Sequence, residues 1–243
     1  FAFCYKIPDG KGPRVNVQSE LTAYNFAGDY TAWFYNGENH NIGPEKLTET
    51  DGTRLPVMTV KAGDKHYMAI HEACLETGAP LVLQSKGGES LFSVASKPAS
   101  LSPGYTSAWR VVMYGATPGV LTDSHLLELL NPDPDPRYDF SWVKPGLAVW
   151  DWRINGAVWD GFTYGMSYPS WVRMVDFAAE QGFKYLVLDA NWYGPEFESD
   201  SDPVEGEKSQ DVQRLLKYGK EKDVGIWLYL NDVGGRKYPS SRS

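Results

Sequence analysis

Three apolar runs decide the fold of the second half of the chain: GLAVWDW at 146–152, YLVLDANWY at 185–193 and GIWLYLND at 225–232. Each run has the length of a strand and is followed by polar residues. Near-continuous apolar runs of this kind are typical of parallel strands, which are covered on both faces. We therefore predict adjacent parallel strands over 147–152, 185–190 and 226–231.

Amphipathic segments between these runs predict the helices that connect the strands. In the first segment the apolar residues recur at i, i+3, i+4 and i+7, namely at Trp171, Met174, Val175 and Ala178. Gly182 marks the end of this helix. The second segment repeats the spacing at Val212, Leu215, Leu216 and Gly219. We expect helices at 168–181 and 208–222, joined to the strands by right-handed crossovers.

A doubly wound sheet and a (β/α)-barrel both begin in this way, so periodicity alone does not choose between them. The strand ends favour a barrel, because polar and aromatic residues follow the strands and no glycine-rich phosphate loop follows the first one. Aromatic faces stack on pyranose rings, and carboxylates accept hydrogen bonds from sugar hydroxyls. The candidate sugar-binding residues are Trp150, Asp151, Trp152, Asp189, Asn191, Trp192, Tyr193 and Asp232.

The first half of the chain has a different pattern. From 1 to 125 it consists of short alternating runs, such as VMTVK at 57–61 and HYMAIH at 66–71, separated by turn sequences. This pattern predicts an antiparallel β-sandwich. A proline and aspartate run then excludes regular structure, so we predict a linker at 126–144. In the sequence it follows the sandwich and precedes the barrel segment at 145–243.

Composition narrows the class of ligand. The formal net charge is −8 and 14% of the residues are aromatic. A surface of this charge does not favour nucleic acid or anionic lipid, and no run of eighteen apolar residues predicts a membrane span. An uncharged ring-shaped partner such as an oligosaccharide suits an acidic protein rich in Trp and Tyr, although most of these rings are also expected to fill the core.

Motifs for other chemistries are incomplete. HEACL at 71–75 lacks the second histidine of a zinc protease, and GMSYP at 165–169 lacks the last glycine of a nucleophile elbow. The four histidines show no metal-ligand spacing. Asp151, Asp189 and Asp232 could be read as glycosidase carboxylates, but binding of sugar hydroxyls or capping of loops is the favoured interpretation for each.

Longer strings of residues resemble glycoside hydrolase family 97. They are WRVVMYG at 109–115, LLELLNPDPDPRYDFSWVKPGLAVWDW at 126–152 and VDFAAEQGFKYLVLDANWY at 175–193, with HYMAIHEACL at 66–75 as part of the preceding sandwich. The resemblance implies a β-sandwich followed by the start of a (β/α)8 TIM barrel, which is incomplete in this chain. It also implies a bacterial, periplasmic or secreted glycosidase that acts on α-glucosides or α-galactosides.

The resemblance further implies a calcium ion in the active site, with Glu72 as the ligand from the sandwich. Calcium binds hard oxygen ligands such as carboxylates. In the family the catalytic carboxylates lie on barrel strands from the fourth onward, so none is expected in this chain, and the remainder of the same protein is expected to supply them.

Two other functions remain open on the sequence. A non-catalytic carbohydrate-binding protein would use the sandwich and exposed Trp side chains without hydrolysis. An α-galactosidase of another barrel family would share the parallel strands and their polar ends.

Overall fold

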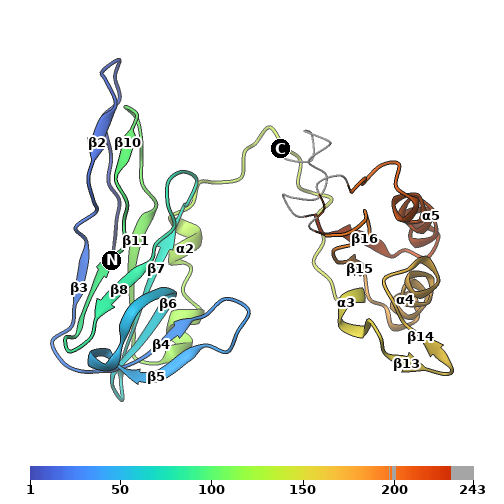
Figure 1. Ribbon diagram of the computed structural model, residues 1–243, viewed down its shortest axis with the longest axis horizontal. Helices are drawn as coiled ribbons and strands as arrows, with labels where there is room; N and C mark the ends of the chain where they lie inside the picture. Colours follow the sequence, from blue (N-terminus) through green and yellow to red (C-terminus); the bar gives the residue numbers. More distant parts are fainter. Residues whose placement is uncertain (197, 199–200, 231–243) are drawn as a thin grey trace. The chain divides into compact units, whose positions relative to one another are not determined.

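A computed structural model describes residues 1–196, 198 and 201–230 of the chain. The chain divides into two compact units, Phe1–Arg137 and Tyr138–Ser243, each of which is described by itself (Figure 1). The division falls within the segment 126–144 that the sequence marks as a linker.

The first unit is built almost entirely of strands, and every strand pair in it is antiparallel. The strands are β1 (Ala2–Phe3), β2 (Val15–Val17), β3 (Ala23–Asn25), β4 (Thr31–Tyr35), β5 (Ile42–Lys46), β6 (Asp51–Gly63), β7 (His66–Ala73), β8 (Leu83–Lys86), β9 (Leu91–Val94), β10 (Ala99–Leu101) and β11 (Trp109–Gly115). A 3-10 turn spans Leu47–Glu49.

The long strand β6 belongs to two sheets. Its first residues pair with β8, in a sheet that continues through β9 to β3. Its later residues lie between β4 and β7, and that sheet continues through β11 to β1. The register with β4 jumps from Phe34↔Met58 to Tyr35↔Leu55, which leaves Pro56 and Val57 unpaired with that strand. Proline has no N–H to donate, so the ladder breaks and β6 changes sheets there.

The core of the first unit lies between the inner faces of these two sheets, which confirms the predicted β-sandwich. Met58 and Ile70 come from one sheet, and Leu83 and Phe92 from the other; all four are at most 1% exposed. The whole buried cluster comprises Ala32, Phe34, Leu47, Met58, Val60, Ile70, Leu81, Leu83, Phe92 and Val94.

Two short helices cover the outer face of β7 and β11: α1 (Pro118–Thr122) and α2 (Leu126–Leu129). Their leucines pack against the buried residues Val111 and Met113. Helix α2 lies in the segment predicted to be a linker, and α1 lies in the part assigned to β-structure, so the stated prediction included neither helix. Pro118 begins that helix, a position where its missing N–H has no effect.

The second unit contains the predicted parallel sheet. Its strands β12 (Ala148–Trp150), β15 (Tyr185–Leu188) and β16 (Gly225–Leu228) are adjacent in the order β12-β15-β16 and pair in parallel. Helices α4 (Tyr168–Gln181) and α5 (Glu207–Glu221) connect them. The helix bounds confirm the sequence prediction to within one residue at each end.

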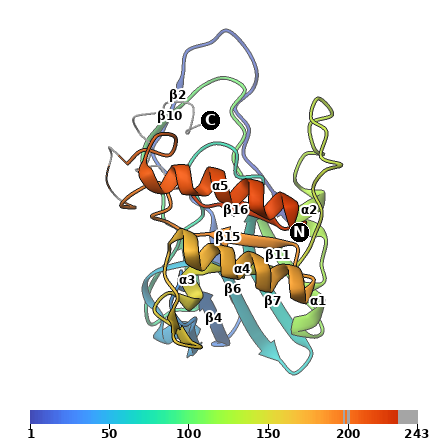
Figure 2. The ribbon, with the colours of Figure 1, turned by 90° about the vertical axis from the view of Figure 1, so that its right-hand side faces the viewer.

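The two helices lie side by side over the same face of this sheet (Figure 2). Trp171 and Val175 of α4, Leu215 of α5 and Leu186 of β15 are each completely buried in one cluster. A doubly wound sheet carries helices on both faces and reverses its strand order at a switch point. Sequential neighbours with helices on one face are instead the opening units of a (β/α)-barrel.

The strand ends differ from the sequence prediction. The first two strands end two residues earlier than expected, and Asp151 begins a helical turn, α3 (Asp151–Ile154). The apolar run continues through Trp152, but a strand needs pairing partners there and the turn satisfies the backbone instead. The third strand begins one residue before the expected 226 and ends at Leu228; Asn231 and Asp232 lie outside the described residues.

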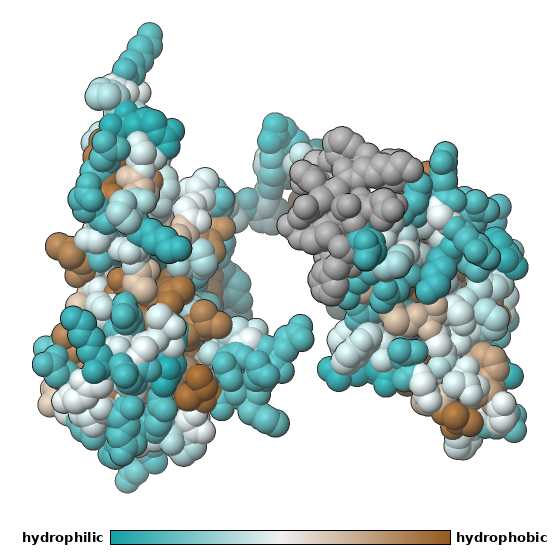
Figure 3. Space-filling model, viewed as in Figure 1, coloured by the Kyte–Doolittle hydropathy of each residue, from teal (hydrophilic) through white to brown (hydrophobic). Residues whose placement is uncertain are grey.

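An unpredicted hairpin follows α3. It is formed by β13 (Val158–Trp159) and β14 (Phe162–Thr163), and the two turn residues, Asp160 and Gly161, have φ of 49° and 68°. An Asp-Gly pair between apolar residues is a strong hairpin signal, because both turn positions require positive φ. Val158 in this hairpin is 68% exposed. Figure 3 shows an apolar patch at the end of the unit where Figure 1 labels β13 and β14.

Candidate functional site

The candidate site lies at the carboxyl ends of β12 and β15. Trp150 pairs with Val187, which pairs with Trp227, so these residues share one row of the sheet. The neighbouring row, Val149, Leu186 and Ile226, packs against the core under the helices. Because side chains alternate between the faces of a strand, Trp150 stands on the face opposite the helices. In a barrel this face is the interior, and its carboxyl end forms the active site.

Asp151 is fully buried at this end of the sheet. One carboxylate oxygen, Oδ1, accepts a hydrogen bond of 2.9 Å from the backbone N–H of Asp189. The other, Oδ2, accepts one of 2.9 Å from the indole N–H of Trp171. Burial raises the pKa of Asp151 above its ordinary value, against the opposing effect of these hydrogen bonds. Both oxygens therefore have hydrogen-bond partners inside the protein, and a direct contact of Asp151 with sugar stays a prediction.

Asp189 is half-buried and binds a neighbouring side chain. Its Oδ2 accepts a hydrogen bond of 2.7 Å from the indole N–H of Trp150, and its Oδ1 accepts one of 2.7 Å from the backbone N–H of Ala190. A carboxylate oxygen has lone pairs for more than one donor, so Asp189 retains acceptor capacity for a ligand hydroxyl.

Trp150 and Trp152 form an exposed aromatic surface, which we call the Trp pair. The side chains are 37% and 50% exposed, and their ring centroids lie 5.7 Å apart at an interplanar angle of 31°. The guanidinium carbon of Arg153 lies 4.8 Å from the ring centroid of Trp150 and 5.0 Å from that of Trp152. This cation–π contact restrains both rings and leaves aromatic surface open to solvent.

The residues after β15 are turned inward. Asn191 adopts a φ of 73°, and its side-chain oxygen accepts a hydrogen bond of 3.0 Å from the backbone N–H of Glu196. Trp192 and Tyr193 are 6% and 1% exposed and belong to the buried cluster of the unit. The indole N–H of Trp192 donates to the carbonyl of Tyr229. Their proposed contact with sugar stays a prediction, as does that of Asp232, which lies outside the described residues.

In the first unit, Glu72 lies on β7 directly opposite Arg110 on β11. Its Oε2 accepts a hydrogen bond of 2.8 Å from the backbone N–H of Leu81 and lies 3.4 Å from the Arg110 guanidinium. The same guanidinium binds both oxygens of Glu20, at 2.9 and 2.6 Å. We call Glu20, Arg110 and Glu72 the ion node; their side chains are 15%, 6% and 11% exposed.

Charges in the ion node are unevenly shared. Burial of Glu20 opposes its ionisation, but hydrogen bonds from Arg110 and Thr22 and the charge of Arg110 lower the pKa of Glu20 below its ordinary value. The hydrogen bonds to Glu20 in turn raise the pKa of Arg110. The bidentate contact of Arg110 with Glu20 is shorter than its contact with Glu72, so Glu20 is the closer partner of the guanidinium. The contacts of Glu72 with Leu81 and Arg110 involve its Oε2, and its Oε1 is left for another ligand.

The sequence did not indicate Glu20, which is 90 residues from Arg110. No local pattern marks such a pair, because only the folded sandwich brings the two segments together. Among the described residues, no group of three or more His, Cys, Asp or Glu side chains is arranged to hold a metal ion.

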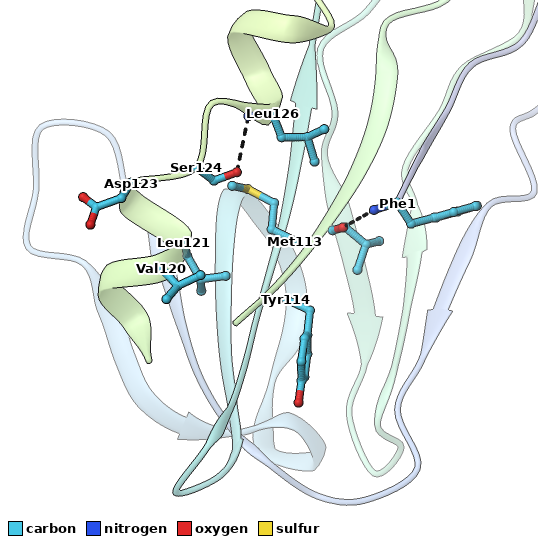
Figure 4. A pocket seen from close by; sticks show the side chains of 9 residues that line it. Phe1, Met113, Tyr114, Val120, Leu121, Asp123, Ser124 and Leu126 are labelled. Atoms are coloured by element: carbon cyan, nitrogen blue, oxygen red, sulfur yellow. Dashed lines mark hydrogen bonds between the residues drawn. The ribbon is translucent and has the colours of Figure 1, made fainter. Parts of the chain in front are cut away.

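Two grooves lie away from these residues. One of about 630 Å³ lies between β11 and the helices α1 and α2, lined by apolar side chains such as Met113, Leu121 and Leu126 (Figure 4). Another, of about 510 Å³, lies at the amino ends of β15 and β16, beside Lys184 and Lys220. Active sites of barrels form at the opposite, carboxyl end of the strands, so neither groove is the expected sugar site. In the described part of the chain no helix is long and apolar enough to span a membrane.

A β-sandwich followed by the opening strands of a (β/α)-barrel, with acidic and aromatic side chains at the carboxyl ends of those strands, is an architecture of carbohydrate-active enzymes. Two family models match the chain: the N-terminal domain of glycosyl hydrolase 97 over residues 1–132, and glycoside hydrolase 97 over residues 149–238. The chain belongs to glycoside hydrolase family 97.

Two curated relatives are each 28% identical to the chain. One is a retaining α-galactosidase of Bacteroides thetaiotaomicron, matched over 83% of this chain and 34% of the relative. The other is a probable retaining α-galactosidase of Streptomyces bingchenggensis, matched over 96% of this chain and 36% of the relative. The chain thus spans about a third of the length of the curated relatives that it matches.

Solved structures show the same architecture. A family 97 enzyme from Pseudoalteromonas sp. strain K8, in complex with panose, has a TM-score of 0.74 and 25% identity, over 93% of this chain and 37% of that one. A β-arabinopyranosidase has a TM-score of 0.66 at 18% identity, over 96% of this chain and 40% of that one, and it shows the fold alone.

Proposed function

We propose that the protein carrying this chain is a glycosidase that hydrolyses α-galactosides. The observation that carries this proposal is the match of both units to family 97, together with two relatives named as retaining α-galactosidases. A second candidate substrate class is α-glucosides, favoured by the family 97 relative that binds panose, an α-glucoside.

The second unit would contribute the surface on which the sugar lies. The Trp pair offers open aromatic faces for stacking on a pyranose ring, and Asp189 beside it offers a carboxylate for hydroxyl groups. Both lie at the carboxyl end of the strands. The site is therefore suited to a neutral, hydroxyl-rich ligand.

The catalytic carboxylates are proposed to lie outside this chain, as the family resemblance implies. A retaining glycosidase needs two carboxyl groups about 5–5.5 Å apart that flank the scissile bond. Asp151 does not suit this role, because it is completely buried and both oxygens accept hydrogen bonds from the protein. Asp189 alone does not make such a pair.

Calcium is part of the proposal, with Glu72 as a ligand. Carboxylate oxygens suit a hard cation such as calcium, and the ion node holds the Glu72 side chain in place through its Oε2. A single carboxylate does not make a calcium site, so other ligands would have to come from beyond the described residues. A bound calcium ion would supply positive charge to stabilise oxygen atoms that become negative during hydrolysis.

Hydrolysis of aryl glycosides tests the activity. The full protein is expected to release the aryl group from an α-galactoside or an α-glucoside, and the ratio of the two kcat/KM values decides the substrate class. Residues 1–243 alone are expected to hydrolyse neither. Sugar binding by the full protein without turnover of any glycoside would instead support the alternative of a non-catalytic carbohydrate-binding protein.

Calcium binding is tested separately by thermal unfolding and calorimetry on the full protein. Calcium is expected to raise the melting temperature, and Glu72→Gln is expected to weaken its binding. Glu45→Gln is a suitable control, because Glu45 also binds an arginine, Arg54, in the same unit but outside the ion node. Equal calcium affinity in Glu72→Gln and the unmodified protein would contradict the assignment.

Export is also proposed, because the resemblance is to periplasmic or secreted bacterial glycosidases. Fractionation of the bacterial cells that produce the full protein tests it, with the protein expected outside the cytoplasm.

A further inference from the structure

Asp151 and Asp189 are linked in a way that connects a buried group to the open Trp pair. Trp150 and Asp151 are consecutive residues at the end of β12, and Asp189 follows the neighbouring strand β15. The Asp151 carboxylate accepts the backbone N–H of Asp189, and the Asp189 carboxylate accepts the indole N–H of Trp150. Two hydrogen bonds thus join the strand ends, one between the Asp151 side chain and the Asp189 backbone and one between the side chains of Trp150 and Asp189.

We propose that Asp151 is a positioning residue for the sugar site, which fixes Asp189 and through it the ring of Trp150 without touching the sugar. This inference rests on the proposed function, since it assigns the Trp pair and Asp189 to the sugar. It names Asp151 as the residue that sets their geometry.

Two N–H groups explain why an acidic residue stands at position 151. The backbone N–H of Asp189 and the indole N–H of Trp171 both point at this carboxylate. An asparagine has one acceptor oxygen, so its amide N–H₂ would face one of these donors. A leucine would leave both donors without a partner. A carboxyl group offers one oxygen to each of the two donors, which accounts for an aspartate at this buried position.

A purely structural role for Asp151 would be to accept the hydrogen bond from the buried indole N–H of Trp171. Trp171 is completely buried in the core under α4, and its hydrogen bond with Asp151 joins that core to the strand end. If Asp151 served only to satisfy this indole, loss of either partner would have the same effect. If Asp151 positions Asp189, only changes on the Asp189 side would move the Trp pair.

The experiment compares variants of the full protein. Asp151→Ala removes both acceptors, Trp171→Phe removes only the bond on the core side, and Asp189→Ala removes the partner of Trp150 directly. Sugar recognition is measured as KM and kcat on the aryl glycoside that the protein hydrolyses. Position is measured independently as the hydrogen-exchange rate of the Trp150 indole N–H by NMR.

We expect Asp151→Ala to raise KM and the exchange rate of the Trp150 indole about tenfold, the effect of one charge-assisted hydrogen bond, with little change in kcat. Asp189→Ala should reproduce the faster exchange, and Trp171→Phe should leave both quantities near those of the unmodified protein. If Asp151→Ala does not fold, Asp151→Asn is measured instead, with a smaller change in the same direction.

Indole exchange tests the positioning role of Asp151, and hydrolysis of glycosides tests the proposed function. Unchanged indole exchange in the Asp151 variants, or an equal increase in Trp171→Phe, would overturn the positioning role. A protein that hydrolyses no α-glycoside would overturn the proposed function, while the exchange rates would still decide whether Asp151 positions Trp150.

Discussion

The two units each bury an acidic group at their candidate functional site, but they stabilise it by different means. In the ion node, the guanidinium of Arg110 offsets the charge of Glu20 and contacts Glu72. At the strand ends, Asp151 accepts hydrogen bonds only from neutral N–H groups. The pKa of Glu20 is therefore lowered and that of Asp151 is raised. Burial alone does not set the pKa of a carboxyl group; the hydrogen bonds and the charge that its partners offer also decide the direction of the shift.

The largest expected effect is on the ion node. Arg110→Met leaves two carboxylates in the sandwich without their cation, which is expected to lower the free energy of unfolding of the first unit by about 3–5 kcal/mol. Hydrogen exchange of the β11 amides measures this unit by itself. The triple variant that also carries Glu20→Gln and Glu72→Gln should regain part of the loss. A loss below about 1 kcal/mol, typical of an exposed pair, would remove the contrast between the two units.

A smaller loss is expected at the strand ends. Asp151→Ala leaves the backbone N–H of Asp189 and the indole N–H of Trp171 unsatisfied, and it is expected to lower the stability of the second unit by about 1–3 kcal/mol. Hydrogen exchange of the β15 amides reports the change, with the β11 amides as an internal control. If Asp151→Ala proved more stable than the unmodified protein, the hydrogen bonds would not offset the burial of the charge.

The parts of this fold that the sequence could predict depend on local signals. Helix α4 ends where Gly182 adopts a φ of 72°, and its buried face follows directly from the spacing of Trp171, Met174 and Val175. The hairpin after α3 also had a local signal in Asp160 and Gly161, which the prediction overlooked.

Other features depend on contacts between distant segments. Trp150 and Trp192 follow similar apolar runs, but one ring is open and the other is buried. The difference arises at Asn191, where a positive φ turns the chain inward after β15. The partnership of Glu20 with Arg110 is likewise created by the folded sandwich. Residue type and spacing identified the strand ends as a polar region, but not which side chains face solvent.

The two units should also differ in how their stability depends on pH, because Glu20 and Asp151 should act in opposite directions. The pKa of Glu20 is lowered from 4.5, so its contribution is present above pH 4.5 and is lost as the pH falls through the folded-state pKa. The pKa of Asp151 is raised from 3.8, so the folded state binds the proton more tightly. The contribution of Asp151 therefore increases as the pH falls through its folded-state pKa toward 3.8.

Glu20→Gln and Asp151→Asn each remove one titrating carboxyl group, so each variant isolates the effect of that group on the pH dependence of stability. The difference in stability between the unmodified protein and Glu20→Gln should shrink on acidification. Hydrogen exchange of the β11 amides measures this difference. On acidification the unmodified protein should become more stable relative to Asp151→Asn. Hydrogen exchange of the β15 amides measures this difference. Slopes of the same sign at both places would contradict the distinction between a carboxylate paired with a cation and one held by neutral donors.

The smallest expected effect comes from a variant that destabilises the second unit without touching its charges. Gly182 closes α4 with a φ of 72°, and a Cβ at this position would meet no atom within 4 Å. Gly182→Ala therefore adds only backbone strain, of about 1 kcal/mol. The β15 amides should exchange faster in this variant, while the pH slope attributed to Asp151 and the exchange of the Trp150 indole should stay as they are in the unmodified protein. Because Asp151→Ala and Gly182→Ala weaken the same unit, the indole separates them: faster exchange of the Trp150 N–H in both would mean that any loss of stability loosens the Trp pair, and that Asp151 has no particular hold on it.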